Sequence, residues 1–195
     1  MLAVQVENEY GAYGDDTAYL EHLADSLRRH GVDVPLFTCD QPADLERGAL
    51  AGVLATANFG SRPAAHLATL RTARPSAPLL CTEFWIGWFD RWGGNHVVRD
   101  AEQASQELDE LLATGASVNF YMFHGGTNFG FMNGANDKHT YRPTVTSYDY
   151  DAPSTRPAIR PRSSPPSARS SPNTPRSPRK SRPHPPGSSA WRRWS

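Results

Sequence analysis

Short apolar runs alternate with amphipathic stretches over residues 1–123 of the chain. Apolar runs bounded by turn residues are typical of buried strands in a parallel sheet. Between them, apolar residues recur every three or four positions, which is typical of amphipathic helices. The pattern predicts strands at 2–6, 35–39, 52–59, 78–85 and 117–123, and helices at 16–31, 42–45, 64–75 and 100–115. This βα repetition predicts an α/β fold with a parallel sheet and right-handed crossovers.

Two of the predicted strands end at a carboxylate. The first runs into Asn8-Glu9, and the fourth runs into Glu83 with several tryptophans close behind. In α/β barrels the chemistry lies at the C-terminal ends of the strands. Two carboxylates beside aromatic rings suit glycoside hydrolysis, because one can protonate the leaving oxygen while the other attacks or activates water. Strand-end acids also cap helices or face solvent, and this alternative stays open for the Asn-Glu pair taken alone.

Four longer motifs follow one another along residues 1–153 and resemble those of glycoside hydrolase family 35, the β-galactosidases. They occur in the order in which that family has them. The matching residues are Gln5-Val6-Glu7-Asn8-Glu9-Tyr10-Gly11, Thr82-Glu83-Phe84-Trp85 with Gly87-Trp88 and Trp92-Gly93, Asn119-Phe120-Tyr121-Met122-Phe123 with Gly125-Gly126-Thr127-Asn128-Phe129-Gly130, and Thr146-Ser147-Tyr148-Asp149-Tyr150-Asp151-Ala152-Pro153.

The resemblance implies a (β/α)8 TIM barrel, of which this chain holds the C-terminal part. A complete barrel takes about 250 residues, whereas the chain has 195. Its five predicted strands would be strands four to eight, within a partial TIM-barrel catalytic domain over 1–151. Three βα units would then be absent. The alternative to an active enzyme is therefore an inactive truncated fragment or pseudogene product, with at most weak galactoside binding.

By resemblance, Glu9 is the general acid/base and Glu83 the nucleophile of a retaining enzyme that removes terminal non-reducing β-D-galactose. Retention predicts carboxyl groups about 5 to 5.5 Å apart. Glu9 has to stay protonated while Glu83 stays ionised, so we expect their repulsion to raise the pKa of Glu9. Glu7 is expected on the same face as Glu9, deeper in the barrel and in a structural role. β-Glucosidase or mannanase activity stays open, because the wider clan shares Asn-Glu at a strand end.

Four further side chains match sugar-contacting positions of the family. Tyr121 and Tyr150 are expected to bind the sugar and Trp88 the aglycone, while a role as core tyrosine is the alternative for each tyrosine. Asn8 is expected to bind the sugar 2-hydroxyl. Adjacent residues of an ideal strand face opposite ways, so Asn8 needs a twist or bulge at the strand end to reach the site of Glu9.

We expect no metal and no cofactor. Cys39 and Cys81 are the only cysteines, and they lie on predicted buried strands without metal-ligand spacing. The expected partner is a β-galactoside oligosaccharide or glycoconjugate, and the oligomeric state stays open. No apolar run reaches the roughly 18 residues of a membrane span, so we expect no membrane association. No signal-peptide pattern follows Met1, which leaves the compartment open with the cytoplasm slightly favoured.

The formal net charge of zero is the sum of two unlike parts. All 20 acidic residues lie in 1–151 with 10 Lys or Arg, whereas 152–195 holds the other 10 bases, 11 Pro and 11 Ser. This composition predicts disorder. A basic tail with Trp191 and Trp194 suits nucleic acid or an SH3-like groove, but we expect no nucleic-acid partner. Translation out of frame is the preferred explanation, since reading the codons two positions on permits Val-Asp-Glu-Ala-Gly-Asp-Pro-Thr, a common family continuation.

Overall fold

The computed structural model describes residues 1–130, 132–137 and 139–154 of the chain. Disorder is predicted for residues 152–195. Of these, residues 155–195 lie outside the described part of the chain. Ala152 and Ser154, at the start of the segment 152–195, contact the rest of the folded chain, whereas Pro153 between them is exposed. Ala152 is 7% exposed, and the backbone N–H of Ser154 donates to the carbonyl of Phe123 at 3.1 Å. Packing thus continues at least three residues beyond the predicted boundary at 151.

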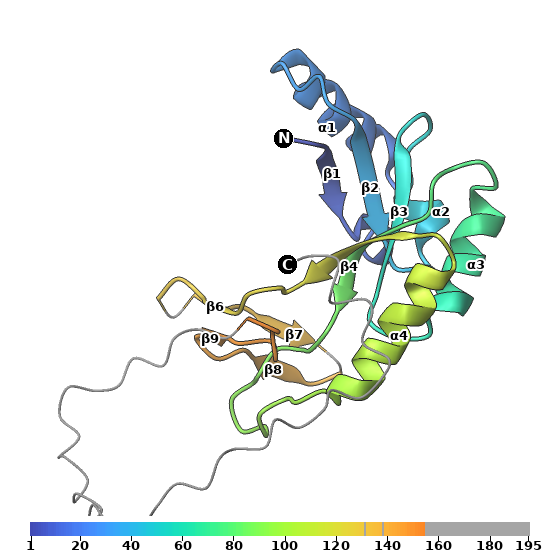
Figure 1. Ribbon diagram of the computed structural model, residues 1–195. Coiled ribbons are helices and arrows are strands. Elements are labelled where there is room, and N and C mark those ends of the chain that lie inside the picture. The colour runs from blue at the N-terminus through green and yellow to red at the C-terminus, as the bar shows by residue number, and fades with distance from the viewer. Residues whose placement is uncertain (131, 138, 155–195) are drawn as a thin grey trace, which may run out of the picture. The chain divides into compact units, whose positions relative to one another are not determined.

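The five predicted strands form one parallel sheet in the order β1-β2-β3-β4-β5 (Figure 1). They are β1 Val4–Asn8, β2 Leu36–Asp40, β3 Leu54–Phe59, β4 Leu80–Trp85 and β5 Ser117–Tyr121. A segment with a helix joins each strand to the next, which confirms the predicted α/β organisation. Because the strands are parallel, their C-terminal ends lie along one rim of the sheet.

The helices are α1 Thr17–Arg29, α2 Leu45–Gly48, α3 Pro63–Ala73 and α4 Ala101–Ala113, and one 3-10 turn, η1, lies at Tyr10–Ala12. Asp16 and Asp100 cap α1 and α4, each accepting a backbone N–H three residues on, at 3.2 and 2.7 Å. Gly31 follows the end of α1 at a φ of +88°, which favours glycine. The short helix predicted at 42–45 lies at 45–48, because residues 41–44 close a turn of their own.

Two apolar clusters hold the helices against the sheet. Helix α1 packs on β1 and β2, and the buried residues of this cluster are Val6, Leu20, Ala24, Leu36 and Leu50. Helices α3 and α4 pack on β3 to β5 through a larger cluster that includes Ala57, Phe59, Leu67, Leu70, Cys81, Phe84, Leu108 and Leu111. Burial of these apolar side chains supplies the main stabilisation of the fold. It also fixes one face of the sheet toward the helices.

Beyond β5 the chain forms two small antiparallel sheets that the apolar pattern did not predict. The pairs are β6 Gly126–Thr127 with β9 Ser147–Tyr148, and β7 Ala135–Asp137 with β8 Tyr141–Pro143. They lie beyond the C-terminal end of β4 (Figure 1). Among the described residues, no helix combines the length and the apolar character that crossing a bilayer requires.

Candidate active site

An irregular register lies in β1 directly before Asn8. Gln5 pairs with Phe37 and Asn8 pairs with Cys39, so β1 has one residue more than β2 over the same stretch. The side-chain oxygen of Asn8 accepts from Gln5 Nε2 at 2.9 Å and lies 3.5 Å from Cys39 Sγ. The irregularity that the sequence required at this strand end is therefore present. Binding of a sugar hydroxyl by Asn8 stays a prediction.

The same irregularity makes one expectation about Glu7 wrong. Glu7 does not share the surroundings of Glu9, because its Oε2 accepts from the hydroxyl of Tyr19 on α1 at 2.6 Å. Its Oε1 accepts from the backbone N–H of Asn8 at 2.9 Å. The extra residue interrupts the two-residue alternation on which the expectation rested. The Glu7 carboxylate thus binds helix α1 and the backbone of Asn8. These contacts support the predicted structural role.

Glu9 lies just after β1, at the start of η1, with a left-handed backbone at φ +51°. Its backbone N–H donates to the carbonyl of Cys39 at 2.9 Å, which ties it to the end of β2. Its carboxylate accepts from Asn58 Nδ2 at 3.2 Å and from Gln41 Nε2 at 3.3 Å. Both donors are neutral amides, so Glu9 is oriented without a cation among these partners.

A second irregular register lies beside Glu83 in β4. Cys81 and Phe84 pair with Val118 and Phe120 of β5, so β4 also has one extra residue. Cys81 and Phe84 are both fully buried in the apolar cluster against the helices. Two residues lie between them where strict alternation leaves room for one. The extra residue therefore keeps Glu83 out of the apolar core, to which strict alternation from Cys81 would have turned it.

The carboxylate of Glu83 is half-buried and accepts from the indole Nε1 of Trp85 at 2.9 Å. Burial raises the pKa of Glu83, and the charge of Glu9 raises it further, while the indole hydrogen bond lowers it. The sequence argument placed the raised pKa on Glu9. For Glu83, the raised pKa follows from the hydration that its half-buried carboxyl loses among the strand ends.

Asn58 joins the Glu9 carboxylate to the residue before Glu83 and was missed in the sequence analysis. Its amide donates to Glu9, and its oxygen accepts from the hydroxyl of Thr82, the residue before Glu83, at 2.9 Å. Thr82 also shares a hydrogen bond of 2.7 Å with Thr56, and its carbonyl accepts from Asn119 Nδ2 at 2.9 Å. The available signal was the pair of polar residues, Thr56 and Asn58, inside the apolar run 52–59.

The predicted tyrosines lie together in an aromatic cluster. The Tyr121 hydroxyl hydrogen-bonds that of Tyr148, and the ring of Tyr150 lies 5.4 Å from that of Tyr121 and 5.8 Å from that of Tyr148. Tyr150 is only 3% exposed, and burial raises its pKa, as do the neighbouring Tyr121 and Glu83. Tyr150 thus packs as the core-tyrosine alternative describes. Sugar binding by either predicted tyrosine stays a prediction. Tyr148 also belongs to this aromatic cluster, which the sequence analysis did not predict.

An open pocket of about 520 Å³ lies at the ends of β3 and β4, and its lining includes neither Glu9 nor Glu83. Trp85 and Trp88 line it, together with Gln41 and Asn58, the two side chains that donate to Glu9. Ligand pockets commonly fall between about 300 and 1,000 Å³. The structure therefore places Trp88 at the wall of a space large enough for a sugar unit, with the acid of Glu9 held nearby.

Within residues 1–130, 132–137 and 139–154, no group of three or more His, Cys, Asp or Glu side chains gathers closely enough to hold a metal ion. Cys39 and Cys81 are buried free thiols, and burial raises the pKa of each to about 12. At neutral pH both are therefore thiols rather than thiolates, the form that binds metals.

Comparison with known proteins relates the site to a family. The model of glycosyl hydrolases family 35 matches residues 1–157. The chain is 46% identical over 154 residues to "Beta-galactosidase-1-like protein 2" from Homo sapiens, covering 78% of this chain and 24% of that protein. It is also 46% identical over 158 residues to "Beta-galactosidase" from Xanthomonas manihotis, covering 78% and 26%. The chain thus spans about a quarter of the length of these relatives.

The resemblance seen in the motifs is confirmed by this match. The matched segment includes both carboxylate strands, the aromatic cluster and the pocket-lining tryptophans. Since it covers well over half of the residues, the chain belongs to glycosyl hydrolases family 35.

Proposed function

We propose that the chain carries the catalytic carboxylates of a β-galactosidase that hydrolyses terminal non-reducing β-D-galactose with retention of configuration. The observation that carries the proposal is the hydrogen-bonded connection from Glu9 through Asn58 to Thr82, which directly precedes Glu83. The charge of Glu9 acts on the pKa of Glu83, so the two carboxyl groups lie within electrostatic reach. Relatives named beta-galactosidase support galactose as the sugar.

In this proposal Glu9 is the acid and base, and Glu83 is the nucleophile. Glu9 donates a proton to the glycosidic oxygen while Glu83 attacks the anomeric carbon and forms a glycosyl-enzyme ester. Glu9 then removes a proton from the water that hydrolyses this ester, which restores both carboxyl groups. The Trp85 indole favours the ionised form of Glu83, as a nucleophile requires. A carboxyl separation of about 5 to 5.5 Å is expected for this mechanism.

The sugar-binding roles in this proposal are those that the family resemblance implies. We assign the 2-hydroxyl to Asn8, the rest of the galactose ring to Tyr121 and Tyr150, and the aglycone to Trp88. For Tyr150 this requires a small rearrangement of the aromatic cluster, since its ring is almost fully buried. The substrate is a β-galactoside oligosaccharide or glycoconjugate, and no cofactor takes part.

We also propose that β1 to β5 are strands four to eight of a (β/α)8 barrel and that residues 1–151 form this partial catalytic domain. The parallel order and the single helix-covered face support the proposal. In a closed barrel the other face lines the interior, where Thr56, Asn58 and Thr82 hydrogen-bond. Residues 152–195 remain, in this proposal, a tail translated out of frame.

The test is turnover of a chromogenic β-galactoside by the purified 195-residue chain. We expect Glu9→Gln and Glu83→Gln each to lower kcat by at least ~100-fold, since each removes a group that acts on the reacting atoms. The matched control is Glu46→Gln, because Glu46 is exposed and pairs only with Arg74 in the described residues. The galactoside should be preferred over the glucoside, which differs in its 4-hydroxyl.

A labelling experiment separates the two roles. A 2-deoxy-2-fluoro-β-galactoside with a good leaving group should add its sugar mass to the peptide that contains Glu83, and to no peptide in Glu83→Gln. Labelling at Glu9 would reverse the assignment. If the chain shows neither turnover nor labelling, it is the inactive fragment described as the alternative.

A further inference from the structure

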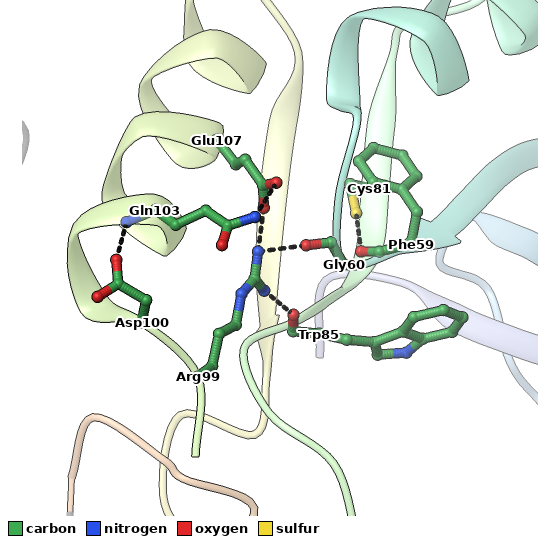
Figure 2. A network of polar contacts seen from close by, with 8 residues as sticks. All are labelled: Phe59, Gly60, Cys81, Trp85, Arg99, Asp100, Gln103 and Glu107. Atoms are coloured by element: carbon green, nitrogen blue, oxygen red, sulfur yellow. Dashed lines mark hydrogen bonds and ion pairs between the residues drawn. The ribbon is translucent and has the colours of Figure 1, made fainter. Parts of the chain in front are cut away.

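The guanidinium group of Arg99 binds residues at the ends of two strands and on one helix. It lies just before α4, and its side chain donates to the carbonyl of Trp85, to the carbonyl of Gly60 at 2.5 Å and to the carboxylate of Glu107 on α4 (Figure 2). Its backbone N–H donates to Asp151 Oδ2 at 2.6 Å. The guanidinium also lies over the Phe84 ring, 5.6 Å from the centroid. No motif or pattern in the sequence had pointed to Arg99.

The surroundings of this arginine are more buried than those of a surface ion pair. The side chains of Arg99 and Glu107 are 17% and 15% exposed. Gly60 and Trp85 lie at the C-terminal ends of β3 and β4, where the sheet ladder stops and carbonyl groups need other donors. The planar, five-donor guanidinium can serve both carbonyls and a carboxylate at once, which a lysine ammonium cannot match in geometry.

A short path leads from Arg99 to Glu83. Arg99 holds the backbone of Trp85, and the indole of this same residue donates to Glu83 at 2.9 Å. Tryptophan has only two side-chain torsions, so a backbone held in place limits the indole N–H to the few positions that its rotamers reach. The donor to the proposed nucleophile is thus oriented from outside the sheet.

We propose that Arg99 is a positioning residue for Glu83, acting through Trp85. The proposal rests on the proposed function in one respect, namely that Glu83 is the nucleophile. The hydrogen-bond geometry itself can be tested without any turnover. The same arginine anchors Asp151, next to Tyr150, so it also aligns the aromatic cluster with the end of β4.

The first experiment follows the Trp85 indole N–H by nuclear magnetic resonance in the full chain labelled at tryptophan with nitrogen-15. Trp85→Phe assigns the resonance. Because the indole donates to Glu83, its shift should follow the ionisation of Glu83 with pH. We expect Arg99→Gln to weaken this hydrogen bond, so that the indole signal moves and its titration midpoint rises. Arg99→Lys should show the same effect, because lysine keeps the positive charge but lacks the planar set of donors that binds both carbonyls and Glu107.

Arg71 provides the matched control. Its guanidinium also bridges two backbone carbonyls, those of Pro75 and Ala77 at 2.9 and 2.7 Å, but it does so at the end of α3. We expect Arg71→Gln to leave the indole resonance and its midpoint unchanged. An unchanged indole in both Arg99 variants, with a lowered melting temperature, would mean that Arg99 only stabilises the fold and would overturn the proposal.

Kinetics provide a second, separate measurement. With a chromogenic galactoside, Arg99→Lys should lower kcat by about 10 to 100-fold with little change in KM, because misplacement of the nucleophile affects the transition state more than substrate binding. A chain with no turnover at all would contradict the proposed function, while the indole measurement would still decide the role of Arg99. A rise of KM by about 10 to 100-fold with kcat unchanged would contradict the positioning role.

Discussion

The two carboxylates differ in what surrounds them at the scale of single residues. Glu9 accepts from two neutral amides at the rim, whereas Glu83 is deeper and accepts from one indole. Hydrogen bonds run from Glu9 through Asn58 to Thr82, the residue before Glu83, and both Asn58 and Thr82 are buried, with 0% and 8% exposure. A buried polar chain of this kind is costly to interrupt, because each lost partner leaves a group without solvent or hydrogen bond.

The role of Thr82 gives the first prediction. Thr82→Val keeps the shape but removes the hydroxyl that donates to Asn58 and bonds Thr56. We expect the free energy of unfolding to fall by about 1 to 3 kcal/mol, measured by urea denaturation. The control, Thr72→Val on α3, removes a hydroxyl that bonds only the Ala68 carbonyl at the exposed surface, and should change it by about 0.5 kcal/mol or less. Equal effects would contradict the importance of the buried chain.

Asp40 gives a prediction about pH. It is 1% exposed, accepts from the Gly11 N–H at 2.9 Å, and burial raises its pKa to about 6 from 3.8. The folded chain therefore binds more protons than the unfolded chain between these values, so stability falls as pH rises through that window.

Asp40→Asn removes this dependence. Relative to the unmodified chain, the variant should gain on the order of 2 to 3 kcal/mol between pH 4 and pH 7, as urea unfolding at both values would show. Parallel pH profiles for the two proteins would contradict the assignment of the titration to Asp40.

At the scale of elements, the turn that presents Glu9 is supported from behind by α2. The Asp40 carboxylate lies directly against Gly48 of α2, where an added Cβ would be 1.9 Å from Asp40 Oδ1. Gly11 of η1 is equally enclosed, since its Cβ would be 2.4 Å from the Asp44 carbonyl. These glycines allow β2, η1 and α2 to approach closely, so the rim that holds Glu9 has little space to shift.

Gly48→Ala should therefore force α2 and η1 apart. We expect a loss of about 1 to 3 kcal/mol in the free energy of unfolding, together with a lowered kcat because the turn carries the proposed acid. Gly126→Ala is the control, since an added Cβ there meets nothing within 4 Å. The comparison is made by thermal unfolding and by turnover, and an unaffected Gly48→Ala chain would show that the contact can relax without cost.

For the whole molecule, the extent of the folded unit can be tested by truncation. A chain ending at Ser154 should unfold at the same temperature as the full chain within about 1 °C, because a Pro/Ser/Arg-rich segment cannot bury enough surface to contribute. A chain ending at Asp151 should be less stable by about 1 kcal/mol, because it lacks buried Ala152 and the Ser154 bond to Phe123. Calorimetry measures the unfolding temperature of both truncated chains. A marked fall for the chain that ends at Ser154 would assign residues 155–195 a role in stability.

The sequence was sufficient for the five strands, their parallel pairing and the family, because apolar runs, caps and long motifs are local features. It failed where contacts join distant residues. Arg99 is 14 and 39 positions from the residues whose carbonyls it holds, and Asn58 is 49 positions from Glu9. Alternation misplaced Glu7 because an extra residue changes which face a side chain takes, and no short pattern marks such a residue.

The extra residues in β1 and β4 have a consequence for protein engineering. If Glu9 and Glu83 were transferred to the regular strands of an idealised scaffold, a strict two-residue repeat would turn one neighbour of each carboxylate to the wrong side. A working graft must therefore carry the insertion along with the acid. The transferable unit is each carboxylate together with its irregular stretch of backbone, and a pair of carboxylates alone would reproduce the composition of the site without its geometry.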